Sequence, residues 1–308
     1  PGRALHYAET LAGDTTIGHA VAYCRAVEGL ANIPVSPRAH VIRGIAAELE
    51  RMANHVGDLG ALAGDVGFLP TLNYCGRIRG DVLNLTAELC GSRLGRGWLR
   101  PGGVACDAGN EMLGKVKRRI VQALHDMQNA VDLLWQSSSV RARFENVGIL
   151  TKEIAMDLGV VGPAARASGI DRDSRRDLPA GLYVDRRPAS VVGDDGDVSA
   201  RALQRWREIE SSVFFLTQVL DEPGGGNVIS PMEPLAPNTI VLSVVEGWRG
   251  EIVHLAITDG AGRFLQYKIV DPSFRNWYAL GIAMRDQAIA DFPLCNKSFN
   301  LSYSGHDL

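Results

Sequence analysis

Cysteine is scarce in this sequence, and its spacing excludes the familiar metal-binding patterns. The 308 residues include five cysteines: Cys24, Cys75, Cys90, Cys106 and Cys295. No two of them form a CxxC pair, which excludes a zinc ribbon and a contiguous iron–sulfur run. The odd number, together with the absence of a basic stub followed by an apolar core, leads us to expect no secretory leader and buried thiols in a reducing cytoplasm.

Strong net charge and long apolar runs are also lacking. The formal net charge is −3, so no global cationic field attracts nucleic acid. The apolar runs are far shorter than a bilayer span; one of them, residues 238–245, is closed by Glu246. Neither a GxGxxG between strand and helix nor a GxxxxGK(S/T) occurs, and HExxH and GxSxG are absent as well. The sequence therefore shows no dinucleotide or nucleoside triphosphate cradle and no familiar hydrolase motif.

Apolar residues recur with helical spacing through the first two thirds of the chain. Between Pro37 and Leu59 they alternate intervals of three and four, which is typical of a helix packed lengthwise against other helices. Ser36 is a suitable N-cap for this helix. The same kind of spacing predicts further helices over residues 17–30, 74–90, 111–135, 151–158, 200–220 and 276–289.

Only the last third of the chain has strand character. Residues 240–246, 251–258 and 264–270 are rich in β-branched residues and are joined by short turns. We therefore predict an α+β fold that is predominantly helical, a long-helix bundle with a small antiparallel sheet in the C-terminal third. We expect one domain over 1–308: a helical bundle part (1–180), a polar surface excursion (181–198) and a helix-plus-sheet part (199–308). Because the first residue is Pro1 rather than Met, we expect the natural N-terminal region to be missing.

Several polar residues admit two interpretations from the pattern alone. His55 and Glu48 lie seven residues apart beside the inner stripe of their helix. They form either a proton relay or an interhelical polar pair, and we favour the interhelical pair. Arg249, in the turn 247–250, is either a surface arginine or part of a site. The arginines at 77, 79, 93, 96 and 100 are either solvated or part of a partner interface.

A series of segments, taken together, carries a family resemblance. They include Gly18–Glu28, Glu48–Arg51 with His55 and Asp65, Arg77–Arg79, Arg100–Val104, Gly162–Asp173, Trp248–Glu251, Thr258–Gly260 and Pro272–Phe274. In this order and spacing the chain resembles the large subunit shared by energy-converting NiFe hydrogenases (formate hydrogenlyase type) and the quinone-site large subunit of respiratory complex I. The resemblance covers nearly the whole chain and implies the hydrogenase large-subunit fold.

The resemblance also identifies ligand positions that this chain has lost. Such hydrogenases hold nickel and iron with four thiolates, and soft sulfur ligands suit that metal pair. The four positions fall on Ala12, Thr15, Ser302 and Gly305, so we expect no metal here. The position that resembles the quinone-binding tyrosine of complex I falls on Gly13, and its histidine partner belongs to a segment that precedes Pro1.

The resemblance implies a hydrogenase-derived, complex I-like large subunit of a membrane-associated oxidoreductase. We expect a pocket for a quinone or another small acceptor, lined by Thr15, His19, Arg249, Ser302 and His306. His19 and Arg249 are the candidate catalytic residues, and Arg249 resembles the arginine that lines the hydrogenase pocket. The alternative is a non-catalytic scaffold subunit that kept the fold and lost the reaction.

The expected partners follow from the same resemblance. They are an iron–sulfur small subunit, which would carry the cluster, and membrane-arm subunits. We expect no cofactor in this chain and no transmembrane segment, and a cytoplasmic location at the inner face of the cell membrane through those partners. NAD binding is expected in other subunits of such a complex, because no nucleotide motif occurs in this chain.

Overall fold

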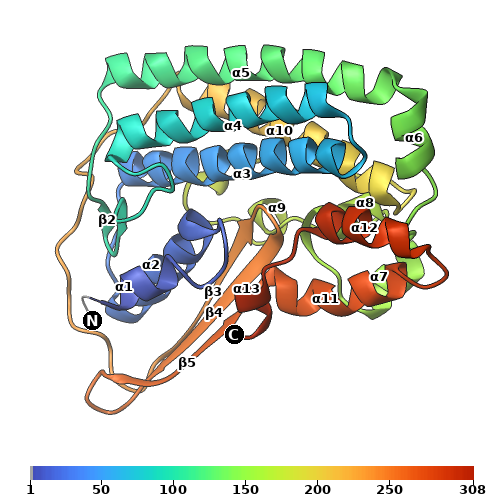
Figure 1. The fold of residues 1–308 in the computed structure, drawn as a ribbon. Helices are drawn as coiled ribbons and strands as arrows, with labels where there is room; N and C mark the ends of the chain where they lie inside the picture. The colour runs from blue at the N-terminus through green and yellow to red at the C-terminus, as the bar shows by residue number, and fades with distance from the viewer. Residues whose placement is uncertain (1–2) are drawn as a thin grey trace.

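The computed structural model describes residues 3–308 (Figure 1). Its α-helices are α1 Ala4–Ala8, α2 Thr16–Ala31, α3 Pro37–Asp65, α4 Leu69–Cys90, α5 Asn110–Gln136, α6 Ser138–Phe144, α7 Lys152–Asp157, α8 Gly162–Ala167, α9 Ser174–Asp177, α10 Val198–Val219, α11 Pro272–Ala283, α12 Phe292–Phe299 and α13 Tyr303–His306. Two 3₁₀ turns are η1 Gly181–Tyr183 and η2 Ile289–Asp291. The strands are β1 Leu99–Arg100, β2 Gly103–Val104, β3 Ile240–Gly247, β4 Gly250–Thr258 and β5 Phe264–Val270.

Four long helices, α3, α4, α5 and α10, form the bundle at the top of Figure 1. Helix α3 lies at its centre and packs against both α4 and α10, while α4 also packs against α5. Helix α3 begins at the N-cap predicted from the sequence, because Ser36 Oγ accepts a hydrogen bond from the Ala39 amide (3.1 Å) and Pro37 occupies the first turn. The predicted inner stripe of α3 is buried, including Ile42, Leu49 and Val56.

The three-stranded sheet lies below the bundle and is antiparallel in the order β3-β4-β5. A two-residue turn, Trp248–Arg249, joins β3 to β4, where Gly247 pairs with Gly250. Helix α2 packs against β3 and β4 and so lies between the sheet and the start of the chain. Of the two edge strands, β3 packs against α2, and we call β5 the outer strand because most of its residues are exposed. The predicted fold class is therefore confirmed.

The tight connector predicted at Arg100–Val104 is a small hairpin of β1 and β2. Its glycines are required by close backbone packing: a Cβ built on Gly103 would lie 1.9 Å from the Val228 carbonyl oxygen, at φ +154°. The buried Glu28–Arg43 pair fixes the hairpin, since Arg43 Nη2 donates to the Arg100 carbonyl (2.7 Å) and Glu28 accepts from the Gly102 amide (2.7 Å).

Several parts of the chain differ from the predicted pattern. The helix predicted over 276–289 is α11, which starts earlier because Asp271 caps it and Pro272 fits its first turn, and which ends near Met284. The short helices α1, α6, α8, α9, α12 and α13 are additional to the predicted ones. In segment 181–198 the middle is largely exposed, whereas Leu182 and residues 196–198 are buried, and Leu182 packs against Gly44 of α3.

One hydrophobic core connects the two predicted parts of the chain. A continuous cluster of buried side chains begins at Leu5, passes through the bundle and ends at Leu301 in the C-terminal segment. A smaller cluster of Ala26, Leu30 and Ala256 lies between α2 and the sheet. Figure 1 shows the first and last described helices, α1 and α13, on the same side of the bundle, beside the sheet.

Candidate functional site

The two segments that the resemblance aligned with thiolate ligands meet in space. The Gly13 amide donates to Ser302 Oγ (3.2 Å), which joins the loop before α2 to the C-terminal segment 289 residues away. Arg249 then holds both segments: Nη1 donates to the Gly13 carbonyl (2.7 Å) and to Thr15 Oγ1 (2.8 Å), and Nε donates to the Asn300 carbonyl (2.5 Å). We call Thr15, Arg249 and Ser302, with Gly13, the central cluster.

The central cluster is closed rather than open to solvent. The exposed fractions of Thr15, Arg249 and Ser302 are 2%, 7% and 6%. Arg249 is therefore not a surface arginine, although it lies in a hairpin turn. Its guanidinium lies 3.9 Å from the ring centre of Trp248, which also donates to Thr15 Oγ1 (3.1 Å). Burial lowers the pKa of Arg249, and nearby carboxylates, Asp271 first, oppose that change.

The four ligand positions do not fit a nickel–iron centre. Ala12 carries no ligating atom, and the hydroxyls of Thr15 and Ser302 accept hydrogen bonds from the protein. At Gly305 a Cβ would lie 2.5 Å from Asp271 Oδ1, so a cysteine there requires Asp271 to move. Among residues 3–308, no group of three or more His, Cys, Asp or Glu side chains is placed to hold a metal ion. The site is built from hydroxyls, an arginine and backbone instead.

His19 reaches the central cluster through Asp271. Its Nε2 lies 3.0 Å from Asp271 Oδ2, and Asp271 in turn lies against Gly305 and caps α11 by accepting from the Ser273 amide (2.8 Å). On its other side, His19 Nδ1 lies 3.0 Å from His254 Nε2. His19, Asp271 and His254 are all fully buried. Burial raises the pKa of Asp271, but His19 and Ser273 more than offset it, so this pKa lies below its usual range.

His306 lies apart from the other predicted pocket residues. Its ring packs against Phe274 and Trp277, with ring centres 6.0 Å and 5.0 Å away. Only its backbone joins the site, where its amide donates to the Ser302 carbonyl (3.0 Å). The structure thus brings Thr15 and Arg249 into direct contact, joins Ser302 to them through the Gly13 backbone, and connects His19 to this group through Asp271. The ring of His306 belongs to an aromatic group on α11 and α13.

His55 and Glu48 do not pair with each other, which corrects the predicted pairing. His55 Nε2 lies 3.0 Å from Glu208 Oε2, on α10. Glu48 also bonds to α10, because Ser212 Oγ donates to it (2.6 Å), and it accepts from Arg51 and Arg175 as well. Both residues therefore make interhelical contacts, but with separate partners.

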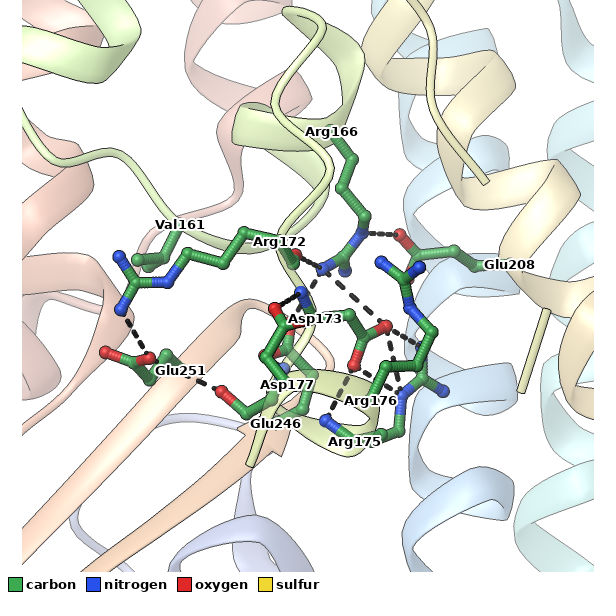
Figure 2. Close-up of polar contacts among 12 residues, drawn as sticks. Val161, Arg166, Arg172, Asp173, Arg175, Arg176, Asp177, Glu208, Glu246 and Glu251 are labelled. Carbon is green, nitrogen blue, oxygen red and sulfur yellow. Dashed lines mark hydrogen bonds and ion pairs between the residues drawn. The ribbon is translucent and has the colours of Figure 1, made fainter. Parts of the chain in front are cut away.

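These contacts belong to a buried ion network that joins α3, α8, α9, α10 and β3 (Figure 2). In Figure 2, Arg166 lies between Glu208 and Glu246; it donates from Nε to Glu208 (2.9 Å) and from Nη1 to Glu246 (2.8 Å). Arg175 donates to Asp173 (2.5 Å) and reaches Glu48 on α3. No local pattern predicts this network, because its members are far apart along the chain.

The network is close to electroneutral. The arginines are Arg51, Arg166 and Arg175, and the carboxylates are Glu48, Asp173, Glu208 and Glu246. Burial raises the pKa of Glu208, but Arg166 and His55 lower it by more than burial raises it. The pKa of Glu208 is therefore well below its usual value. For Glu246 burial prevails over Arg166 and the pKa is raised. Three guanidinium groups thus face four carboxyls, of which Glu246 is the one that most readily keeps a proton.

Glu50 lies in the Glu48–Arg51 segment of the resemblance, which assigned it no role, and it holds the first turn of α2. Its carboxylate accepts hydrogen bonds from the amides of Ile17 (2.6 Å) and Gly18 (3.0 Å). The N-cap residue Thr15 makes no side-chain capping bond, so Glu50 supplies the cap from α3. Burial raises the pKa of Glu50 to about 7, against the two amides that lower it.

The clustered arginines lie mainly on the surface. Arg77 is about half exposed and pairs with Asp81 and Asp126, and Arg79 lies 3.6 Å from Asp14, in the loop that leads to the central cluster.

No helix among the described residues combines the length and apolar character that crossing a membrane requires.

The chain is similar to known proteins over nearly its whole length. Residues 65–238 and 232–307 match the family described as "Respiratory-chain NADH dehydrogenase, 49 Kd subunit". An NADH-quinone oxidoreductase subunit of Clostridium beijerinckii is 35% identical over 260 residues, which are 82% of this chain and 69% of that protein. Membrane-bound hydrogenase subunit alpha of Pyrococcus furiosus is 30% identical, over 96% of this chain and 73% of its own length. The carbon monoxide-induced hydrogenase of Rhodospirillum rubrum is 29% identical, over 92% of this chain and 78% of its own length. The chain belongs to the family of the 49 kDa subunit of the respiratory-chain NADH dehydrogenase, which is related to hydrogenase large subunits.

Proposed function

We propose that this chain is the large subunit of a multi-subunit oxidoreductase, held at the inner face of the cell membrane by its partners. Relatives named as an NADH-quinone oxidoreductase subunit and as a membrane-bound hydrogenase subunit support this assignment. In this proposal an iron–sulfur small subunit carries electrons to the chain, and membrane-arm subunits anchor the assembly. The chain itself contributes hydrogen-bonding groups rather than metal ligands.

A small acceptor of the quinone class binds beside the central cluster in this proposal. The observation that carries it is the meeting of the loop before α2 and the C-terminal segment at Arg249, next to the buried pair of His19 and Asp271. A quinone carbonyl needs hydrogen-bond donors and, on reduction, protons. Arginine and histidine supply these in a site from which water is largely excluded.

The test is quinone reduction by the assembly purified through a tag on this chain. Arg249→Ala and His19→Ala are compared with Arg263→Ala, an exposed arginine in the β4–β5 turn whose side chain is 81% exposed. We expect the Arg249 and His19 variants to lose at least about tenfold in turnover while the subunit composition stays unchanged, because the first removes a positioned guanidinium and the second removes the partner of the Asp271 carboxylate. Unchanged turnover of the Arg249 and His19 variants in intact assemblies would contradict the proposed acceptor site.

A non-catalytic scaffold subunit is the second candidate function, and one observation favours it. The donors of Arg249 are directed at protein acceptors, the carbonyls of Gly13 and Asn300 and the hydroxyl of Thr15, so the arginine already has a structural task. A scaffold predicts that Arg249→Ala lowers the yield of assembled complex. It also predicts that whatever complex forms keeps its turnover. The composition and the turnover of the same preparation therefore separate the two candidates.

A further inference from the structure

A line of hydrogen-bonded side chains leads from the central cluster toward the outer strand of the sheet. His19 lies between Asp271 and His254, at 3.0 Å from each, and His254 Nδ1 lies 2.8 Å from Tyr267 Oη on β5. The four residues come from α2, the cap of α11, β4 and β5, so the line crosses the sheet. Its inner end, Asp271, touches Gly305 beside the central cluster.

The outer end of this line lies near open space. Tyr267 is only partly buried, on a strand that is mostly exposed. Its ring packs against Phe264 and Tyr23, with ring centres 5.5 Å and 6.2 Å away. Both neighbours line a cavity of about 660 Å³, which opens between α1, the β1–β2 hairpin and the β4–β5 turn. The line thus runs from a fully buried carboxylate to a partly buried tyrosine whose two neighbouring rings line the cavity.

We propose that Asp271, His19, His254 and Tyr267 form a proton path between the outer strand β5, beside this cavity, and the central cluster. The use of this path, to deliver protons to an acceptor, rests on the proposed function. Its geometry does not depend on which acceptor binds. Every nitrogen and oxygen along it has a partner at hydrogen-bond distance, which a path that passes protons by short hops requires.

The protonation states along the path are consistent with one direction of donation. Burial raises the pKa of Tyr267, so its hydroxyl keeps a proton to donate to His254 Nδ1. Burial lowers the pKa of His254 to about 3, so this ring is neutral and its Nε2 carries the hydrogen that His19 Nδ1 accepts. His19 Nε2–H then donates to the Asp271 carboxylate. In this arrangement each N–H or O–H along the line faces an acceptor on the next group.

A transfer along this path moves one proton and no electrons. A proton from solvent binds the Tyr267 oxygen while the phenol proton passes to His254 Nδ1. The His254 Nε2 proton passes to His19 Nδ1, and the His19 Nε2 proton passes to Asp271 Oδ2. Each N–H or O–H bond that breaks is matched by one that forms on the next group. The net result is a protonated Asp271 beside the central cluster.

The first experiment needs no turnover. We would measure the exchange of the His19 Nε2 proton with D₂O by nitrogen-15 NMR in the full chain, its Tyr267→Phe variant and its Tyr23→Phe variant. Tyr267→Phe keeps the ring and removes the hydroxyl, and Tyr23→Phe makes the same change on the adjacent ring. We expect exchange to slow by at least about tenfold in Tyr267→Phe and to stay unchanged in Tyr23→Phe. A merely destabilised variant would exchange faster, not more slowly.

Equal exchange rates in all three proteins would overturn the path and leave the line as structural hydrogen bonding. The second readout is acceptor reduction by the assembled complex, where Tyr267→Phe should slow turnover by about tenfold and Tyr23→Phe should not. An assembly with no acceptor reduction at all would contradict the proposed function, while the exchange result would still decide the path. Slow exchange in Tyr267→Phe together with unchanged turnover would show that the path exists but does not serve the acceptor site, which overturns its proposed use.

Discussion

Among single residues, the positions that the resemblance aligned with metal ligands now make structural contacts. Thr15 and Ser302 place hydroxyls where the resemblance places thiolates, and both accept hydrogen bonds from the opposite segment or from Arg249. Gly305 leaves just enough room for the Asp271 carboxylate that His19 bonds. The chemistry of the site therefore rests on hydrogen-bond donors and a buried carboxylate rather than on soft sulfur ligands.

Gly305 tests how tightly this contact is packed. Gly305→Ala adds a Cβ at 2.5 Å from Asp271 Oδ1, so we expect the free energy of unfolding to fall by about 1–3 kcal/mol. Gly76→Ala is the control, because Gly76 lies inside α4 with nothing within 4 Å of its Cβ position, and alanine there should stabilise by up to about 1 kcal/mol. Urea titration measures both. If Gly305→Ala destabilises the protein no more than Gly76→Ala does, Asp271 moves freely and the contact is not tight.

Arg166 tests the buried ion network. Arg166→Met leaves Glu208 and Glu246 without their main cation inside the protein, so we expect a loss of about 3–5 kcal/mol in the free energy of unfolding. Arg77→Met removes an arginine with two carboxylate partners at the surface, where water replaces the lost contacts, and should cost at most about 1 kcal/mol. Similar losses for the two variants, measured by urea titration, would contradict the energetic role assigned to burial.

Among the helices and strands, α2 is notable because a residue of another helix holds its start. The carboxylate of Glu50 accepts the first free amides of α2 and lies toward the positive end of the helix dipole. Since burial outweighs these contacts, the pKa of Glu50 is raised to about 7. A carboxyl whose pKa is higher in the folded state stabilises the fold only while it stays protonated there.

The raised pKa of Glu50 sets the sign of its pH dependence. Between its unfolded pKa, 4.5, and about 7, the folded state holds a proton that the unfolded state has lost, so the contribution of Glu50 to stability falls as pH rises. Over this window the fall amounts to roughly 3 kcal/mol. Glu50→Gln removes this contribution, so the variant should lose less stability than the parent between about pH 5 and pH 7 in urea titrations. Parallel pH profiles of the two proteins would refute the raised pKa.

Helices and strands with a long regular pattern are predictable from the sequence, and short ones are not. The stripe on α3 and the β-branched runs of β3 and β4 are local signals, and the structure confirms them. Periodicity alone starts the last long helix at Asn276, whereas the capping signal Asp271–Pro272 directly follows β5 and starts α11 earlier. Helices α12 and α13 have eight and four residues, too few for periodicity to show.

The site is predictable only in part, for a related reason. Thr15, Arg249 and Ser302 can be found because they match motif positions of a family. Asp271 and His254 lie 252 and 235 residues from His19, and no local pattern records a contact of that range. The ion network escapes prediction in the same way, since its arginines and carboxylates look like surface charges until the fold buries them.

In the molecule as a whole, one hydrophobic core joins the bundle to the C-terminal segment, and one ion network joins the bundle to the sheet. Leu5 and Leu301 belong to the same buried cluster, and the network joins α3 to β3. We therefore propose that residues 1–308 unfold as one unit. Tryptophan fluorescence reports on both parts, through Trp98 and Trp248 among others, while far-UV circular dichroism follows the helices. We expect the fluorescence and circular dichroism signals to share one urea midpoint. Two separated transitions would contradict unfolding as a single unit.

In our proposal this member of the family works without a metal centre of its own, inside an assembly whose partners carry the redox groups. The metal and quinone content of the complex purified through this chain decides between this proposal and a hydrogenase. We predict no nickel, iron–sulfur signals that are assigned to a partner subunit, and a bound quinone. Stoichiometric nickel bound to this chain would contradict the proposal, because Ala12, Thr15, Ser302 and Gly305 offer no thiolate to hold it.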